Sequence, residues 1–219
     1  PALLKLKLNV NEIISTLMLN YIGILFLEYL VFGPWKDPRS HGFPMSPEFG
    51  ANALTGAIPG TAINWGLAWG LFFGLAMWVF LRFTRAGYEL RACGENPRAA
   101  RYARMPVGGL VIFTMTAGGA LAAWAGFIET SAAIGRLQPT IMVGYGYTAI
   151  VVAWLAELSP VYIALASLLL AGLRVGVENL QLELQVPAAY GTILEGLILI
   201  TVLAGGFFNR YRLHWRGAR

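Results

Sequence analysis

The sequence predicts an all-α fold, a polytopic bundle of transmembrane helices, from its composition, its long apolar runs and the placement of its arginines. Of the 219 residues, 57% are hydrophobic and 12% are charged, whereas soluble domains typically carry about 25% charged residues. The mean hydropathy is +0.62. We therefore expect one integral membrane domain over residues 1–219. Because the chain begins at Pro1 without an initiator Met, we also expect it to be the C-terminal part of a longer polypeptide.

Four apolar segments have the length of membrane spans. About 20 mainly apolar residues are needed to cross about 30 Å of hydrocarbon, and residues 13–32, 63–81, 107–128 and 190–208 satisfy this. Two more apolar segments, residues 141–156 and 161–173, lie on either side of Pro160, which cannot continue a preceding helix. We predict about six spans, the middle pair joined by a tight turn, with a re-entrant hairpin as the alternative.

The arginines predict the orientation, because Lys and Arg gather in cytoplasmic loops. One basic group lies between the second and third spans and another follows the last span: Arg82, Arg85, Arg91, Arg98, Arg101 and Arg104, then Arg210, Arg212, Arg216 and Arg219. Six crossings that place both termini in the cytoplasm satisfy this distribution. The net charge of +5 is thereby explained by topology, and no nucleic-acid partner is predicted.

Residues 33–60 are rich in glycine and proline, which disfavours regular structure and suits an ordered external loop. Trp35 and Phe43 are possible anchors of this loop. It has two interpretations, a docking site for an extracytoplasmic partner or a connector lying on the membrane surface.

Small residues recur at helical spacing within two spans. Gly66, Gly70 and Gly74 form one stripe, and Gly118, Ala122 and Gly126 form another. Such stripes let membrane helices approach closely, so they predict packing rather than chemistry.

Polar residues within spans are candidates for a translocation path, since an ionisable group at a helix centre costs roughly 2.5–3.5 kcal/mol on insertion scales. Glu12, Ser15, Thr16 and Asn20 share one helix face, and Glu195 lies in the last span. The shared face predicts contact with a water-filled path or, alternatively, hydrogen bonds between helices.

Convergent catalytic groups are absent from the sequence pattern, so no catalytic site, metal site or cofactor is predicted. The two histidines, His41 and His214, fall on opposite sides of the predicted membrane. Cys93 is the only cysteine, which excludes a disulfide within the chain. No phosphate-binding glycine motif is present, so any nucleotide has to be bound by another chain.

The segment between the second and third spans contains the start of a short helix, because Asn96 is a good N-cap and Pro97 suits the first helical position. Ala99, Ala100 and Ala103 share one face of this helix, and Arg98, Arg101 and Tyr102 share the other. The pattern predicts a protein-docking helix, and the alternative is a basic loop lying on anionic headgroups.

Three segments resemble the inner-membrane permeases of ATP-binding-cassette (ABC) importers for simple sugars and nucleosides, a group that includes the branched-chain amino-acid permeases. They begin Val10-Asn-Glu-Ile, Gly87-Tyr-Glu-Leu and Gly144-Tyr-Gly-Tyr. The resemblance implies a permease of about ten spans, of which this chain is the last six. It also implies that residues 82–106 form the cytoplasmic loop that couples to the ATPase, through Gly94, Glu95, Asn96, Pro97, Arg98, Ala99, Ala100, Arg101, Tyr102 and Ala103.

The sequence departs from the family at two positions. Arg104 stands where the family usually has glycine, and Glu195 stands where glutamine is common. The first departure affects the packing of the coupling loop. The second weakens any inference of this chain's solute from the solutes of its relatives.

The expected function is therefore a permease subunit, not an enzyme, in a bacterial-type cytoplasmic (inner) membrane. The resemblance implies a second permease subunit, a cytoplasmic ABC ATPase dimer, an extracytoplasmic substrate-binding protein and a nucleoside or sugar as solute. The rivals are a branched-chain amino-acid permease, a membrane-embedded enzyme that uses Glu12 or Glu195, and a scaffold whose arginines bind only the lipid bilayer.

Overall fold

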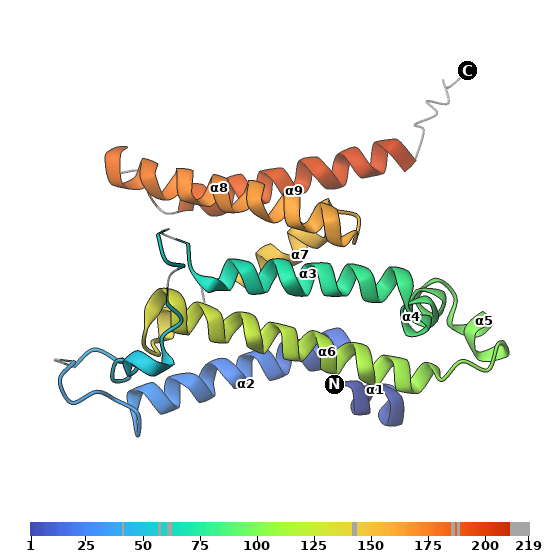
Figure 1. Cartoon of the computed structure of the whole chain (residues 1–219), viewed down its shortest axis with the longest axis horizontal. Coiled ribbons are helices and arrows are strands. Elements are labelled where there is room, and N and C mark those ends of the chain that lie inside the picture. The colour runs from blue at the N-terminus through green and yellow to red at the C-terminus, as the bar shows by residue number, and fades with distance from the viewer. Residues whose placement is uncertain are drawn as a thin grey trace, which may run out of the picture. The chain divides into compact units, whose positions relative to one another are not determined.

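The computed structural model describes residues 1–40, 42–56, 58–60, 63–141, 144–184, 187 and 189–210. These residues form helices joined by loops and contain no strand (Figure 1). The chain divides into two compact units, Pro1–Val143 and Gly144–Arg219, and each is described by itself. His41, His214 and the basic residues Arg212, Arg216 and Arg219 lie outside the described residues.

The first unit is built on three long helices. These are α2 (Glu12–Phe32), α3 (Trp65–Phe83) and α6 (Val107–Ile128), which confirm the predicted spans 13–32, 63–81 and 107–128. The short helices are α1 (Ala2–Leu8), α4 (Arg85–Glu95) and α5 (Pro97–Tyr102), and a π-helical turn, η2 (Glu129–Ile134), continues α6. Short helices α1, α4 and α5 lie at one end of the unit, and the loop that follows α2 lies at the other (Figure 1).

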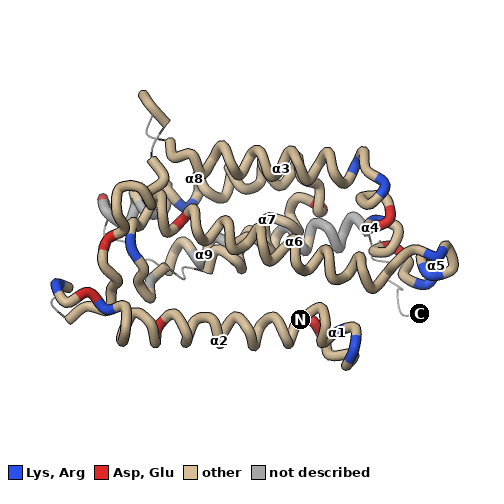
Figure 2. Tube along the Cα trace, turned by 60° about the horizontal axis from the view of Figure 1, so that its bottom comes forward, with Lys and Arg blue, Asp and Glu red and all other residues tan. Residues whose placement is uncertain are grey.

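Charged residues of this unit gather at the two ends of its long helices, and the helix middles are largely free of them (Figure 2). Apolar side chains in those middles face outward; Ile22 and Leu25 of α2 are 60% and 63% exposed. In a bilayer such side chains contact lipid and need no protein core. Among the described residues, four helices are long and apolar enough to cross a membrane: Glu12–Phe32, Trp65–Phe83, Val107–Ile134 and Pro160–Val177.

Aromatic rings hold α3 against α6. The ring centroid of Trp124 on α6 lies 5.6 Å from that of Trp69 and 6.0 Å from that of Phe73, both on α3. The two helices lie close together at Gly66, where a built Cβ would lie 2.4 Å from Cγ2 of Ile128. At the other stripe glycines, Gly70, Gly74, Gly118 and Gly126, a Cβ would meet no heavy atom within 4 Å. The predicted close packing is thus confirmed only at Gly66.

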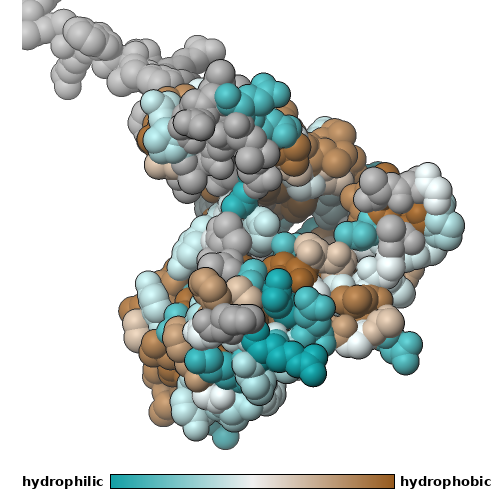
Figure 3. Space-filling model, turned by 90° about the vertical axis from the view of Figure 1, so that its left-hand side faces the viewer, coloured by the Kyte–Doolittle hydropathy of each residue, from teal (hydrophilic) through white to brown (hydrophobic). Residues whose placement is uncertain are grey.

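The loop after α2 is strapped to the segment that follows α6 by hydrogen bonds. The Ser46 hydroxyl accepts from the Leu137 amide at 2.9 Å, and the Phe49 amide donates to the Gly135 carbonyl at 2.8 Å. Hydroxyls of Thr55 and Ser131 lie 2.7 Å apart. These hydrogen bonds hold the loop in place as predicted, while Trp35 and Phe43 are 48% and 63% exposed and their role as anchors stays a prediction. Figure 3 looks onto this end, where hydrophilic and hydrophobic residues are interspersed.

The second unit contains α7 (Tyr145–Leu155), α8 (Pro160–Leu184) and α9 (Ala189–Arg210). A tight turn joins α7 to α8 as predicted, with both Glu157 and Leu158 in the left-handed region at φ 48° and 60°. Buried apolar residues Val152 and Ala156 pack against Ala166 and Leu170. The last helix, α9, covers the predicted span 190–208, but its described apolar part, Ala189–Ile198, is shorter than a span, so this crossing stays a prediction.

The middle pair of spans differs from the prediction in length. The predicted span 141–156 is an 11-residue helix that rises about 17 Å at 1.5 Å per residue, roughly half of the hydrocarbon thickness. Its partner α8 has 25 residues and continues well beyond Leu173. Residues Pro160–Val177 of α8 are long enough to cross a membrane, whereas α7 is not, so the pair of spans and the re-entrant hairpin both stay predictions. A hairpin and a pair of spans both return the chain to the side from which it entered.

Candidate functional site

The corner between α3 and α4 sets the direction in which the predicted coupling segment leaves the membrane helix. Thr84 forms it: its hydroxyl donates to the Phe80 carbonyl at 2.6 Å and accepts from the Gly87 amide at 3.0 Å. Gly87 is buried, and a Cβ there would lie 2.3 Å from the Phe80 carbonyl oxygen and 2.7 Å from Cα of Leu81. Only glycine fits this position without displacing the backbone.

The short helix α5 begins as the sequence predicts. The Asn96 side chain accepts hydrogen bonds from the amides of Arg98 and Ala99, both at 3.1 Å, and Pro97 occupies the first helical position. These contacts satisfy two of the amides that a helix start leaves unpaired. The N-cap and the helix are both confirmed.

Arg104 ends this helix in a left-handed conformation. Its φ is 57°, its amide donates to the Arg101 carbonyl at 3.0 Å, and the Met105 amide donates to the Ala100 carbonyl at 3.0 Å. This pair of bonds is the Schellman arrangement, in which the left-handed residue is usually glycine. The geometry gives a physical reason for the glycine that the family usually has at this position.

We expect Arg104→Gly to stabilise the protein by about 1 kcal/mol, because a non-glycine residue pays a steric cost in the left-handed region. The measurement is the thermal unfolding midpoint of the detergent-purified permease. Arg101→Gly, within α5, is the control. It is expected to lower the free energy of unfolding by a similar amount and so to lower the midpoint. A lower midpoint for Arg104→Gly would contradict the left-handed assignment.

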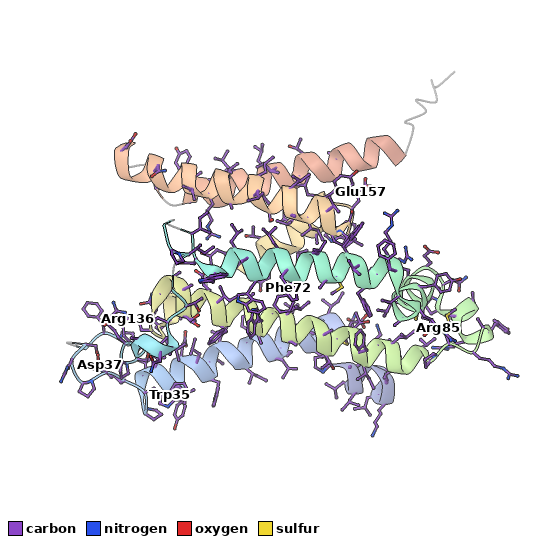
Figure 4. All side chains as sticks on the ribbon, in the orientation of Figure 1. Trp35, Asp37, Phe72, Arg85, Arg136 and Glu157 are labelled. Atoms are coloured by element: carbon purple, nitrogen blue, oxygen red, sulfur yellow. The ribbon has the colours of Figure 1, made fainter. Side chains whose placement is uncertain are left out.

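The predicted coupling residues form a surface. Gly94, Glu95, Asn96, Pro97, Arg98, Ala99, Arg101, Tyr102 and Ala103 are all exposed. Tyr102 is 91% exposed, whereas Ala100 is 3% exposed. The alanine face is therefore divided, with Ala100 packed within the chain and Ala99 and Ala103 available to a partner. Arg85, at the start of α4, lies at this end of the unit, opposite Trp35, Asp37 and Arg136 (Figure 4).

A cavity of about 920 Å³ opens beside this surface. Its walls come from α1, α3, α4, α5 and α6 together with the first residue of α2. Gly94, Pro97 and Arg101 of the coupling segment line it, and so does Glu12 of the predicted path. The structure thus brings one predicted path residue beside three predicted coupling residues, all within the first unit.

The remaining path residues do not gather at this cavity. Glu12 forms an ion pair with Lys5, and the hydroxyls of Ser15 and Thr16 donate to the Glu12 carbonyl at 3.1 and 2.8 Å. Ser15 is buried, while Thr16 and Asn20 are exposed. Glu195 lies in α9 of the second unit, and its side chain is outside the described part.

The sequence pattern did not predict α1 or the ion pair of its residue Lys5 with Glu12. Asn9 ends α1 in the left-handed region at φ 51°, and asparagine is a common residue at that position. Asn9 after a run of leucines and lysines was the signal that would have predicted α1. In the described part of the chain, no group of three or more His, Cys, Asp or Glu residues is placed to hold a metal ion.

Known proteins similar to this chain are transport permeases. This chain is 34% identical to a glucose ABC transporter permease of Haloferax volcanii, over 97% of this chain and 59% of the relative. A guanosine ABC transporter permease of Bacillus subtilis is 29% identical over 92% of this chain and 59% of the relative. A nucleoside ABC transporter permease of Lactococcus lactis is 26% identical over 82% of this chain and 52% of the relative. No solved structure matches.

The chain spans less than 60% of the length of these relatives. The family described as branched-chain amino acid transport system / permease component matches residues 1–203. Its members and the relatives above are transport proteins rather than enzymes, as expected from the thin set of catalytic groups. This chain is a multi-pass membrane protein that belongs to the family of branched-chain amino acid transport system permease components.

Proposed function

We propose that this chain forms part of the translocation subunit of an ABC importer for a nucleoside or simple sugar. A second permease subunit completes the pathway, a cytoplasmic ATPase dimer drives it, and an extracytoplasmic binding protein delivers the solute. The relatives are named as permeases for glucose, guanosine and nucleosides, which favours this solute class over branched-chain amino acids. They also favour transport over a membrane-embedded enzyme or a lipid-binding scaffold.

The proposal rests mainly on α5, which is exposed. Asn96 caps the start of this helix, and the close approach at Gly87 defines the preceding corner between α3 and α4. Thr84, Gly87 and Asn96 fix the direction of the segment, and Arg98, Ala99 and Tyr102 present charge, a small contact and an aromatic ring to a partner. Tyr and Arg are the residue types that dominate protein interfaces. A rigid projection of this kind suits the transfer of movement from an ATPase to membrane helices.

The proposal is tested by purifying the tagged permease from its native membrane and identifying the proteins that accompany it. An ATPase with nucleotide-binding motifs, present in stoichiometric amount, is the expected result. Purification of the intact permease without any nucleotide-binding protein would contradict it.

Orientation is part of the proposal, with both ends of this chain and α4–α5 in the cytoplasm. In intact cells, a cysteine replacing exposed Arg39 in a Cys93→Ser background is expected to react with an impermeant thiol reagent. Native Cys93 should react only after permeabilisation. Labelling of Cys93 in intact cells would show that the orientation is the reverse of the one proposed.

The path assignment predicts that Asn20→Leu and Glu195→Leu impair solute uptake while the ATPase stays bound, because each removes a polar group from a membrane helix. Ile14→Leu, on the opposite face of α2, conserves volume and is the control, with uptake unchanged. Wild-type uptake by both leucine variants would leave Asn20 and Glu195 as packing residues.

A further inference from the structure

The cavity beside α5 is lined by two kinds of residue. Apolar side chains include Phe80 and Leu81 of α3 together with Leu110 and Phe113 of α6. The charged residues of the lining are Lys5, Glu12, Arg91 and Arg101. At about 920 Å³ it has the capacity of sites that enclose a drug-sized ligand.

The charges of this lining are not balanced by the chain itself. Lys5 and Glu12 pair with each other, which leaves two arginines. Arg91 on α4 and Arg101 on α5 form no ion pair with any carboxylate of the described residues. A guanidinium binds phosphate through paired N–H donors, so the cavity combines two unneutralised phosphate-binding groups with apolar lining residues.

The position of the cavity selects among phosphate-bearing ligands. It lies at the end of the membrane helices, where the basic residues gather (Figure 2), at the depth of lipid headgroups if α3 and α6 cross the bilayer. A free phosphate uses the arginines and leaves the apolar lining residues bare. A phospholipid uses both, because its acyl chain extends along the same helices into the hydrocarbon.

We propose that this cavity is a binding site for an anionic phospholipid. The lipid phosphate lies against Arg91 and Arg101, and an acyl chain lies along the apolar lining residues, which include Phe80 and Phe113. Because the arginines come from α4 and α5, the bound lipid joins the coupling segment to the membrane helices. The inference stands on the cavity and its charges and does not require an ATPase.

The test measures lipid retained by the detergent-purified permease with native mass spectrometry, and the thermal unfolding midpoint, after adding phosphatidylglycerol, phosphatidylcholine or inorganic phosphate. Phosphatidylglycerol is expected to be retained and to raise the midpoint, while the other two have little effect. Arg91→Gln with Arg101→Gln should reduce phosphatidylglycerol retention roughly a hundredfold, about tenfold for each of the two charge-assisted contacts that the double variant loses.

The matched control is Arg85→Gln with Arg98→Gln, which removes the same charge from the same two helices at residues that do not line the cavity. It should retain phosphatidylglycerol as the wild type does. Arg101→Gln alone, at an exposed side chain, serves if the double variant does not fold, and should show a smaller loss in the same direction.

Three outcomes would overturn the proposal. These are equal retention of phosphatidylcholine, stabilisation by inorganic phosphate as large as that by phosphatidylglycerol, and an equal loss in the control.

Discussion

Tyr102→Ala and Ala99→Leu are each expected to weaken ATPase binding by about 2 kcal/mol, or roughly 30-fold. Tyr102 is 91% exposed, so its ring contributes little to the fold and is free to fill a pocket of the partner. Ala99 is also exposed, and a leucine there would hold the two surfaces apart. The measurement is the amount of ATPase that remains on the immobilised permease at increasing wash dilution.

Tyr88→Ala is the matched control, because Tyr88 is an exposed tyrosine on the neighbouring helix α4 that lies outside the predicted coupling set. Arg85→Gln is a second control, since Arg85 forms only an exposed ion pair with Glu89, and such pairs contribute little. Normal ATPase binding by both α5 variants, together with a loss in Arg85→Gln, would assign the contact to the basic loop instead of to α5.

Gly87→Ala is expected to destabilise the folded permease by about 3 kcal/mol, the upper range for overpacking a tight site. The added methyl group would lie 2.3 Å from the Phe80 carbonyl oxygen, which is backbone and cannot rotate away as a side chain can. The α3–α4 corner has to open, and α5 then loses its position. The measurements are the thermal unfolding midpoint and the yield of monodisperse protein.

Gly94→Ala in the same helix is the control. A Cβ at Gly94 meets no heavy atom within 4 Å, and alanine has the higher helix propensity by about 1 kcal/mol, so the midpoint should stay or rise. If Gly87→Ala had the stability of Gly94→Ala, the close approach of α4 to the end of α3 would be wrong.

The sequence predicted the parts of this chain that depend on local chemistry. Spans α2, α3 and α6 follow from uninterrupted apolar length, and the start of α5 follows from Asn96 and Pro97, whose capping preferences act over three or four residues. The family's preference for glycine at the position of Arg104 came only from the resemblance, and the left-handed φ at that residue explains it.

Features set by tertiary contacts were beyond the sequence pattern. The strap from Ser46 to Leu137 and from Thr55 to Ser131 joins residues far apart in the chain, and nothing local marks those serines. Likewise, apolar composition continues on both sides of Tyr145, so composition alone did not show that α7 is only 11 residues long. Glu12 lies beside the coupling segment and pairs with Lys5 of α1. Because α1 was not predicted, this position of Glu12 was not predicted either.

Solute uptake by proteoliposomes measures directly whether this permease transports a nucleoside or sugar at the expense of ATP. The permease is reconstituted with the ATPase that accompanies it and with its binding protein, and radiolabelled nucleosides and sugars are supplied on the binding-protein side. We predict accumulation of one of these solutes when ATP is present on the ATPase side, no accumulation with a non-hydrolysable ATP analogue, and reduced accumulation with Tyr102→Ala. Equal uptake with and without hydrolysable ATP would contradict this prediction.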